Sequence, residues 1–213
     1  HGKSVELVLN GVHVGNYFLC EQIKIDENRL AIQDCYEDVQ KDGTPTTDNC
    51  GYLLEFDDNY DEVYKFRTSY YNLPCQSKDE LNTAIWNYVK NWVQDIENKL
   101  HDKNYTAAYE KLDINSVIDY WIVQELTMNN EYRHPKSVYM YKDGTGKLCA
   151  GPVWDFDYQT FPNIANINAI NSGYGHSSLK FGTNTLLYTQ YSYTGGNDGD
   201  APYMWYPLLF GDA

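Results

Sequence analysis

Basic residues, and arginine above all, are scarce in this chain. Its 213 residues include three arginines, and 16 lysines and arginines stand against 30 aspartates and glutamates, which leaves a formal charge of −14. Proteins bind nucleic-acid backbones by clustering basic side chains around the phosphates. We therefore expect no nucleic-acid partner.

Long apolar runs and paired cysteines are also missing. No stretch of about 18 apolar residues occurs, so we expect no membrane span. None of the five cysteines forms a Cys-x-x-Cys pair, so a zinc site is not expected. Cys20 and Cys149 lie in apolar runs and are expected to act as small hydrophobic residues. A disulfide among Cys35, Cys50 and Cys75, which flank polar turns, stays open.

Aromatic residues, in contrast, are abundant. The chain has 21 Tyr, 5 Trp and 7 Phe, and 42% of its residues are hydrophobic, which is a globular composition. It starts without Met and stops where an apolar pattern begins. We therefore interpret residues 1–213 as a single domain cut from a longer polypeptide.

Periodicity predicts strands first and helices later, which is an α+β arrangement. Asn10-Gly11 is typical of a tight hairpin turn between two strands. Ser77 with Glu80 forms a capping box, and Asp113 is a second helix cap. The turn at 143–146 joins a second hairpin, and the aperiodic region 158–202 is expected to be a functional loop. The predicted strands are 5–9, 12–23, 30–32, 51–56, 63–67, 137–142 and 148–153.

Each predicted helix carries an apolar stripe on one side. For the first helix we expect the buried face to hold Leu81, Ile85, Tyr88, Trp92, Ile96 and Leu100. For the second helix we expect it to hold Ile114, Val117, Ile118, Trp121, Ile122 and Leu126.

The segment WDFD at 154–157 is the strongest chemical signal. An apolar strand ends in two carboxylates, Asp155 and Asp157, at a spacing that points both the same way. Such a pair suits a hard cation such as Mg²⁺ or Ca²⁺. The alternative is that one aspartate caps a turn while the other is solvated.

A polar cluster precedes the second hairpin. Asn130, Glu131 and Arg133 follow the second predicted helix, and the hairpin is expected to bring Glu131 back toward Asp155. Carboxylate, amide and metal-binding carboxylate together are the minimum set for phosphoryl transfer. The acidic stretch 57–61, in contrast, is interpreted as a solvated turn.

Three segments of the chain resemble one known family. The segments VELVLNGVHVGNYFLCEQIKID, GYLLEFD and HPKSVYMYKDGTGKLCAGPVWDFD are similar, in wording and in order, to the spore coat protein H (CotH) kinase family. The resemblance runs from Val5 to Asp157 and returns weakly at 204–210. It implies a diverged, atypical protein-kinase-like fold that binds ATP and a divalent metal.

The resemblance also implies roles for single residues. Asp155 is the first choice for Mg²⁺ or Mn²⁺, with Asp157 second. Glu131 stands at the position of the family's catalytic aspartate, and a base misplaced by about 1 Å can lose a hundredfold in rate. Asn130 would hold metal or orient the acceptor.

For nucleotide binding, the family keeps a glutamate on the second strand, which Glu21 matches. The residues themselves add Lys24, the nearest cation, which is either a phosphate contact or a solvated strand lysine, and the scarce arginines Arg29 and Arg133. Trp154 and Tyr52 are candidates for stacking on adenine, with a place in the core as the alternative.

Two functions therefore stay open. The first is an ATP- and metal-dependent kinase that phosphorylates a protein Ser or Thr hydroxyl, with catalysis kept, weakened or lost through Glu131. The second is a non-catalytic surface module that binds a glycan or a protein through the Tyr/Asn-rich loop at 159–202. In both cases the resemblance implies a secreted, periplasmic or cell-surface bacterial protein and a partner in that compartment.

Overall fold

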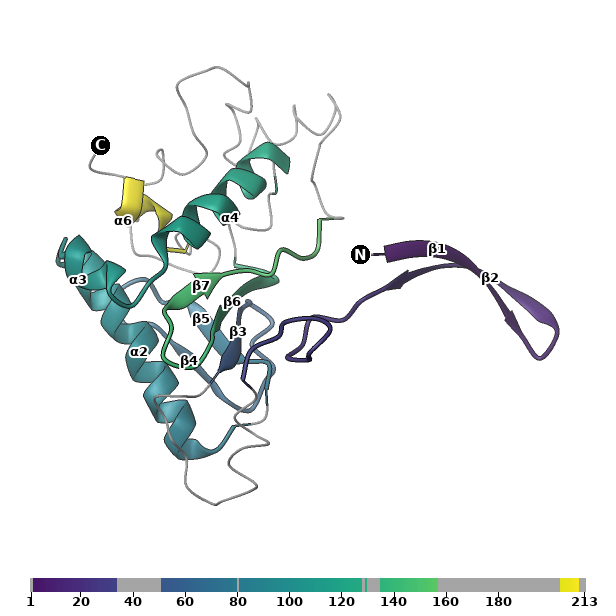
Figure 1. The fold of residues 1–213 in the computed structure, drawn as a ribbon, viewed down its shortest axis with the longest axis horizontal. Coiled ribbons are helices and arrows are strands. Elements are labelled where there is room, and N and C mark those ends of the chain that lie inside the picture. The colour runs from purple at the N-terminus through teal and green to yellow at the C-terminus, as the bar shows by residue number, and fades with distance from the viewer. Residues whose placement is uncertain are drawn as a thin grey trace.

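The computed structural model of the protein describes residues 2–33, 51–79, 81–127, 129, 135–156 and 204–210. The region 158–202 and the disulfide candidates Cys35 and Cys50 lie outside them. Strands and helices are both present, as expected for an α+β protein (Figure 1). In chain order they are β1 (Gly2–Leu9), β2 (Val12–Cys20), β3 (Tyr52–Phe56), β4 (Lys65–Arg67), β5 (Pro74–Ser77), α2 (Thr83–His101), α3 (Tyr105–Tyr109), α4 (Ile114–Thr127), β6 (Val138–Lys142), β7 (Leu148–Ala150) and α6 (Tyr206–Phe210).

β1 and β2 form a hairpin by themselves. Asn10 and Gly11 have φ of 51° and 79°, the positive values that a type I′ turn needs, so this predicted hairpin is confirmed. Figure 1 shows it projecting away from the other elements. The strand predicted at 30–32 is wrong, because that part of the chain makes only an isolated bridge between Ile25 and Leu30.

The other five strands form one antiparallel sheet in the order β4-β5-β3-β6-β7. In the central strand β3, Glu55 lies opposite Gln76 of β5 and Tyr139 of β6. Because successive residues of a strand point to opposite faces, these three side chains form a row across one face of the sheet. We call this the polar face.

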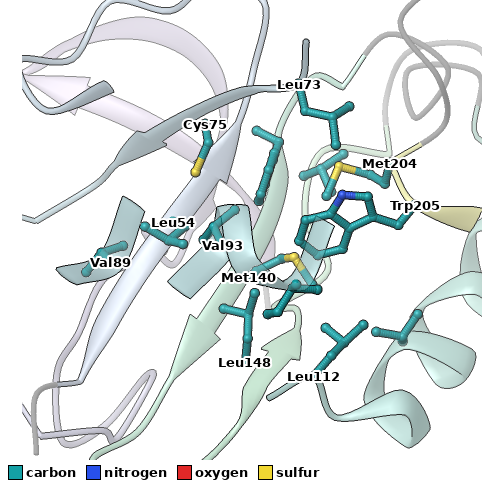
Figure 2. Packing of buried hydrophobic residues seen from close by; sticks show 14 of the residues in the cluster. Leu54, Leu73, Cys75, Val89, Val93, Leu112, Met140, Leu148, Met204 and Trp205 are labelled. Atoms are coloured by element: carbon teal, nitrogen blue, oxygen red, sulfur yellow. The ribbon is translucent and has the colours of Figure 1, made fainter. Parts of the chain in front are cut away.

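The opposite face of the sheet is the hydrophobic core. Tyr52, Leu54 and Phe56 of β3 are completely buried there. Val89 and Val93 of α2 pack against it, and Figure 2 shows them beside Leu54, with Cys75, Met140 and Trp205 in the same cluster. We call this the core face.

The C-terminal segment returns to this core. Met204, Trp205 and Tyr206 are buried, and the Trp205 ring meets Phe56 edge-on at 6.1 Å between centroids. The Trp205 indole N–H also donates to the buried Glu97 carboxylate at 3.2 Å. This segment is therefore an integral part of the domain.

The first long helix starts later than the capping box predicts. Ser77 ends β5, and the side chain of Asn82 accepts from the amide of Ile85 at the helix start, so Asn82 is the cap. The prediction failed because Ser77 is needed in the sheet. The predicted stripe is confirmed for Leu81, Ile85, Ile96 and Leu100, whereas Tyr88 and Trp92 are only partly buried. The buried side extends to Trp86, Val89 and Val93, which the stripe did not include.

The second long helix, α4, has the predicted cap but only part of the predicted buried side. Asp113 accepts from the amide of Ser116 at 3.1 Å, which confirms the cap. Val117, Tyr120 and Gln124 are buried, whereas Ile122 and Leu126 are about half exposed. The predicted stripe is therefore right for Val117, and for Ile114 and Trp121, which pack against the core, but wrong for Ile122 and Leu126. Across the described residues, no helix is long and apolar enough to cross a bilayer.

The cysteine expectations need correction too. Cys75 is a free thiol buried in the core, so a disulfide through Cys75 is ruled out. Cys20 is exposed and Cys149 is half-buried, so neither is a core residue. The short elements β5 and α3 had no counterpart in the sequence prediction, because neither has a clear period.

Candidate functional site

Asp155 lies just past the end of β7 at one edge of the polar face. It is half-buried and has a φ of 62°, in the left-handed region that Asp and Asn tolerate better than most residues. The hydroxyl of Ser137, immediately before β6, donates to Asp155 Oδ2 at 3.2 Å. The predicted strand 148–153 ends at Ala150, and Asp155 is not on extended backbone, so the prediction that a strand points this carboxylate the same way as Asp157 is wrong. The bond to Ser137 ties the segment after β7 to the start of the second hairpin.

A second carboxylate, Asp57, reaches the same serine. Asp57 follows β3 and is 5% exposed. Its Oδ2 accepts from the Ser137 amide at 3.0 Å, and its Oδ1 accepts from the Asn59 amide at 2.7 Å. The expectation that the stretch 57–61 is a solvated turn is therefore wrong for Asp57, because this carboxylate is buried by a contact 80 residues away.

The segment that contains Ser137 is bonded to the end of β3 at a second point. The Asp58 amide donates to the Pro135 carbonyl at 3.0 Å, and Pro135 is buried. Residues 135–137 are thus fixed against the end of β3. This segment continues directly from 130–134, where the sequence predicts the catalytic residues.

The row across the polar face carries buried hydrogen-bonding groups. Gln76 Nε2 donates to Glu55 Oε2 at 3.0 Å, and Glu55 is 6% exposed. Burial raises the pKa of Tyr139, and so do the hydrogen bond and charge of Glu55 and the charges of Asp57 and Asp155. Tyr139 therefore stays a neutral phenol among three carboxylates.

Lys78, which directly follows β5, supplies a cation to this row. Its Nζ lies 3.2 Å from Glu55 Oε2 and donates to Glu62 Oε1 at 2.8 Å. Burial opposes the charged form, but the hydrogen bond to Glu62 and the charge and hydrogen bond of Glu55 outweigh it and raise the pKa of Lys78. The ammonium is therefore charged across the physiological range.

A cleft of about 370 Å³ opens near Asp155, next to the outer strands of the sheet. Its walls are mainly apolar, with one exposed carboxylate from α4. The chain leaves the cleft at Val153, two residues before Asp155. The lining includes Leu30, Asp119, Tyr120, Tyr141, Pro152 and Val153.

Of the nucleotide candidates from the N-terminal part, Arg29 adjoins this cleft. Lys24 and Arg29 both pair with Asp26, at 3.2 and 3.4 Å, and Arg29 precedes the cleft residue Leu30. Glu21 is exposed, immediately after β2.

The two stacking candidates differ in accessibility. Trp154 is half-buried between the cleft residue Val153 and Asp155. Tyr52 is completely buried on the core face, so its ring presents no surface to a base. Of the remaining predicted site residues, Asn130, Glu131, Arg133 and Asp157 lie outside the described residues.

The described side chains form no group of three or more His, Cys, Asp or Glu residues arranged to hold a metal ion. A fully protein-made metal cage is thus not found among them. Mg²⁺ in phosphoryl-transfer sites is instead held by one or two carboxylates together with substrate phosphates and water. Asp155, oriented by Ser137 beside Asp57, fits that second mode.

Sequence reasoning missed Glu55, Asp57, Lys78, Ser137 and Tyr139. One available signal was the pattern of GYLLEFD, where Glu55 and Asp57 stand two residues apart in a strand. This is the same spacing that singled out the WDFD pair. The partners Lys78 and Ser137 gave no comparable local signal.

Comparison with known proteins gives one match. A family model described as CotH kinase protein matches residues 1–191. No curated protein and no solved structure matches the chain.

Proposed function

This chain belongs to the CotH kinase protein family, and from that premise we propose that it binds ATP with a divalent metal and transfers phosphate to a protein Ser or Thr hydroxyl. The fold we propose is a diverged kinase-like one. The observation that carries the proposal is the link from Asp57 through Ser137 to Asp155, at the end of the segment that contains Asn130 and Glu131.

Asp155 is the proposed metal ligand, with Asp157 as a second. A bound Mg²⁺ or Mn²⁺ would neutralise charge on the phosphates during transfer. The Ser137 hydroxyl donates to one oxygen of Asp155, and this bond orients the carboxylate. With a net charge of −14, the protein should hold ATP weakly without its metal.

We propose that the phosphates of the nucleotide lie on the polar face and that its base lies in the cleft of about 370 Å³. The charged Lys78 ammonium on the row with Glu55 is the proposed phosphate contact. The apolar cleft at Leu30, Tyr141 and Val153 suits a base, and Trp154 offers an aromatic ring beside it. Lys24 and Arg29, which share Asp26, are further cations on the cleft side.

Glu131 is the proposed base for the acceptor hydroxyl, with Asn130 beside it. A glutamate is longer than the family's aspartate by one methylene, which moves the base relative to the acceptor. We therefore expect Glu131→Asp to raise the transfer rate. The proposed acceptor is a secreted or surface protein of the same compartment.

Label transfer from [γ-³²P]ATP tests the function directly. The purified chain is incubated with Mn²⁺ or Mg²⁺ and with casein as a general Ser/Thr acceptor. We expect label in casein or in the chain itself, reduced at least hundredfold in Asp155→Asn and unchanged in Asp102→Asn, an exposed control. Glu131→Asp is assayed in parallel.

The outcomes separate the two functions. Metal-dependent ATP binding without transfer, even in Glu131→Asp, would assign a nucleotide-binding protein that has lost catalysis. Neither binding nor transfer at millimolar ATP would refute the proposal and leave the glycan- or protein-binding module as the function to test.

A further inference from the structure

We infer that Asp57 is a positioning residue that sets the orientation of the Asp155 carboxylate through Ser137. The inference rests on the proposed metal role of Asp155 and adds to it a residue from a different strand. It assigns a role to a carboxylate that the sequence pattern suggested was merely solvated.

The first step is that Asp57 itself is rigidly held. Its carboxylate is 5% exposed, and each oxygen accepts a backbone amide, from Asn59 on one side and Ser137 on the other. Taking a carboxylate out of water costs several kcal/mol unless hydrogen bonds compensate, so these amides fix the side chain where it lies.

The second step is that Ser137 joins two carboxylates with two different groups. Its amide donates to Asp57 Oδ2 at 3.0 Å and its hydroxyl donates to Asp155 Oδ2 at 3.2 Å. Ser137 has a φ of 51°, an unfavourable conformation for a residue other than glycine. The surrounding bonds, including that from Asp58 to Pro135, hold this backbone in place.

The third step concerns Asp155, which also has a positive φ of 62°. It lies after β7, in a stretch without regular secondary structure. Residues outside helices and strands gain their precision from such side-chain partners. Residues that orient metal ligands typically change metal affinity or activity by 10- to 100-fold when mutated.

A purely local role for Asp57 explains less. An aspartate that only caps its own turn needs just the bond to Asn59, two residues on. The second oxygen instead reaches across 80 residues to the serine that bonds Asp155. The local role predicts a change in stability alone, whereas positioning predicts a change in metal affinity.

The test measures, by calorimetry, the binding of the non-hydrolysable analogue AMP-PNP at increasing Mn²⁺ concentrations. The variants are Asp57→Asn, which has one acceptor oxygen where the carboxylate has two, and Ser137→Gly, which removes the hydroxyl and relieves the positive φ. Asp58→Asn is the matched control, because it makes the same charge change one residue away on an exposed side chain.

We expect the half-saturating Mn²⁺ concentration to rise about tenfold or more in Asp57→Asn and in Ser137→Gly, and to stay unchanged in Asp58→Asn. The double variant should show little more than one single effect, because both changes break the same chain of bonds. Melting temperatures are recorded, and Asp57→Glu, which keeps the charge but moves both acceptor oxygens, is used if Asp57→Asn unfolds.

Equal Mn²⁺ dependence in the wild type, Asp57→Asn and Ser137→Gly would overturn the inference and leave the proposed function standing. Additive effects in the double variant would also overturn it, since the two residues would then act separately. If the wild type binds no AMP-PNP at any Mn²⁺ concentration, the proposed function falls and takes this inference with it.

Discussion

The two sides of β3 are equally buried but chemically opposite. On the core face, Tyr52, Leu54 and Phe56 are shielded from water by α2 and the C-terminal segment. On the polar face, Glu55 and the following Asp57 are nearly as inaccessible, yet each is a carboxylate with specific hydrogen-bond donors. The two sides therefore differ at Glu55 and beyond, whereas Leu53, on the same side as Glu55, is apolar and completely buried.

Burial has opposite energetic consequences on the two sides of β3. Burying apolar surface stabilises a fold by about 25 cal/mol per Å², so the core face needs no further explanation. Burying carboxylates costs free energy that hydrogen bonds offset only in part. The row of Gln76, Glu55 and Tyr139 across β5, β3 and β6 therefore adds less to stability than the core face does.

The largest expected effect is on the core face. Phe56→Ala should lower the free energy of unfolding by about 3–5 kcal/mol, because it removes a fully buried ring that contacts Trp205. Urea unfolding measures this loss. A loss below about 1 kcal/mol would mean that the C-terminal segment does not pack on the sheet.

The polar face should show the reverse pattern. Lys78→Met should weaken metal-dependent ATP binding about tenfold, or about 1.4 kcal/mol, because a cation facing the phosphates is lost. Its free energy of unfolding should fall by about 1–3 kcal/mol, less than in Phe56→Ala, because the buried Glu55 loses one partner but keeps Gln76. Lys65→Met is the matched control on β4, where Lys65 bonds the Tyr60 carbonyl. Equal ATP affinity in both variants would exclude Lys78 from the site.

The smallest change in the free energy of unfolding is expected away from the sheet, on the surface of α2. Asp95 of α2 pairs with Lys99 and Lys111, and although burial opposes it, these partners lower the pKa of Asp95. Asp95→Asn should therefore cost up to about 1 kcal/mol near pH 7, because the site is partly exposed. The lowered pKa places this stabilisation above the ordinary Asp pKa of about 3.9, and it fades as the pH falls below that value. Urea unfolding of the wild type and of Asp95→Asn is measured at pH 7 and at pH 3. An equal difference in the free energy of unfolding at both pH values would contradict the ion-pair account.

Two local signals predicted local structure correctly, but the capping box at Ser77 did not, because Ser77 belongs to β5. Asn10-Gly11 gave the hairpin turn and Asp113 gave a helix cap, because each acts on residues within three positions. The buried sides of α2 and α4 were only partly predictable. Ile122 and Leu126 are as apolar as the residues that pack inside, and tertiary contacts decide which side is covered.

The candidate site was predictable at one end only. The WDFD motif identified Asp155, but the local pattern of Asp57 is typical of a turn, and nothing near it indicates a bond to Ser137. The same holds for Lys78, whose partner Glu55 lies on another strand. Contacts between distant segments are set by the register of the sheet, which single-sequence patterns do not contain.

One measurement tests most directly whether the polar face is a metal–nucleotide site. The melting temperature of the wild type and of Asp155→Asn is recorded with ATP, with Mn²⁺, and with both. Asparagine keeps the shape of the side chain and tolerates the positive φ of this position, so it removes the charge with little strain. We predict that ATP and Mn²⁺ together raise the wild-type melting temperature and that the rise is lost in Asp155→Asn. An equal rise in both proteins, or none at millimolar ATP, would contradict the account.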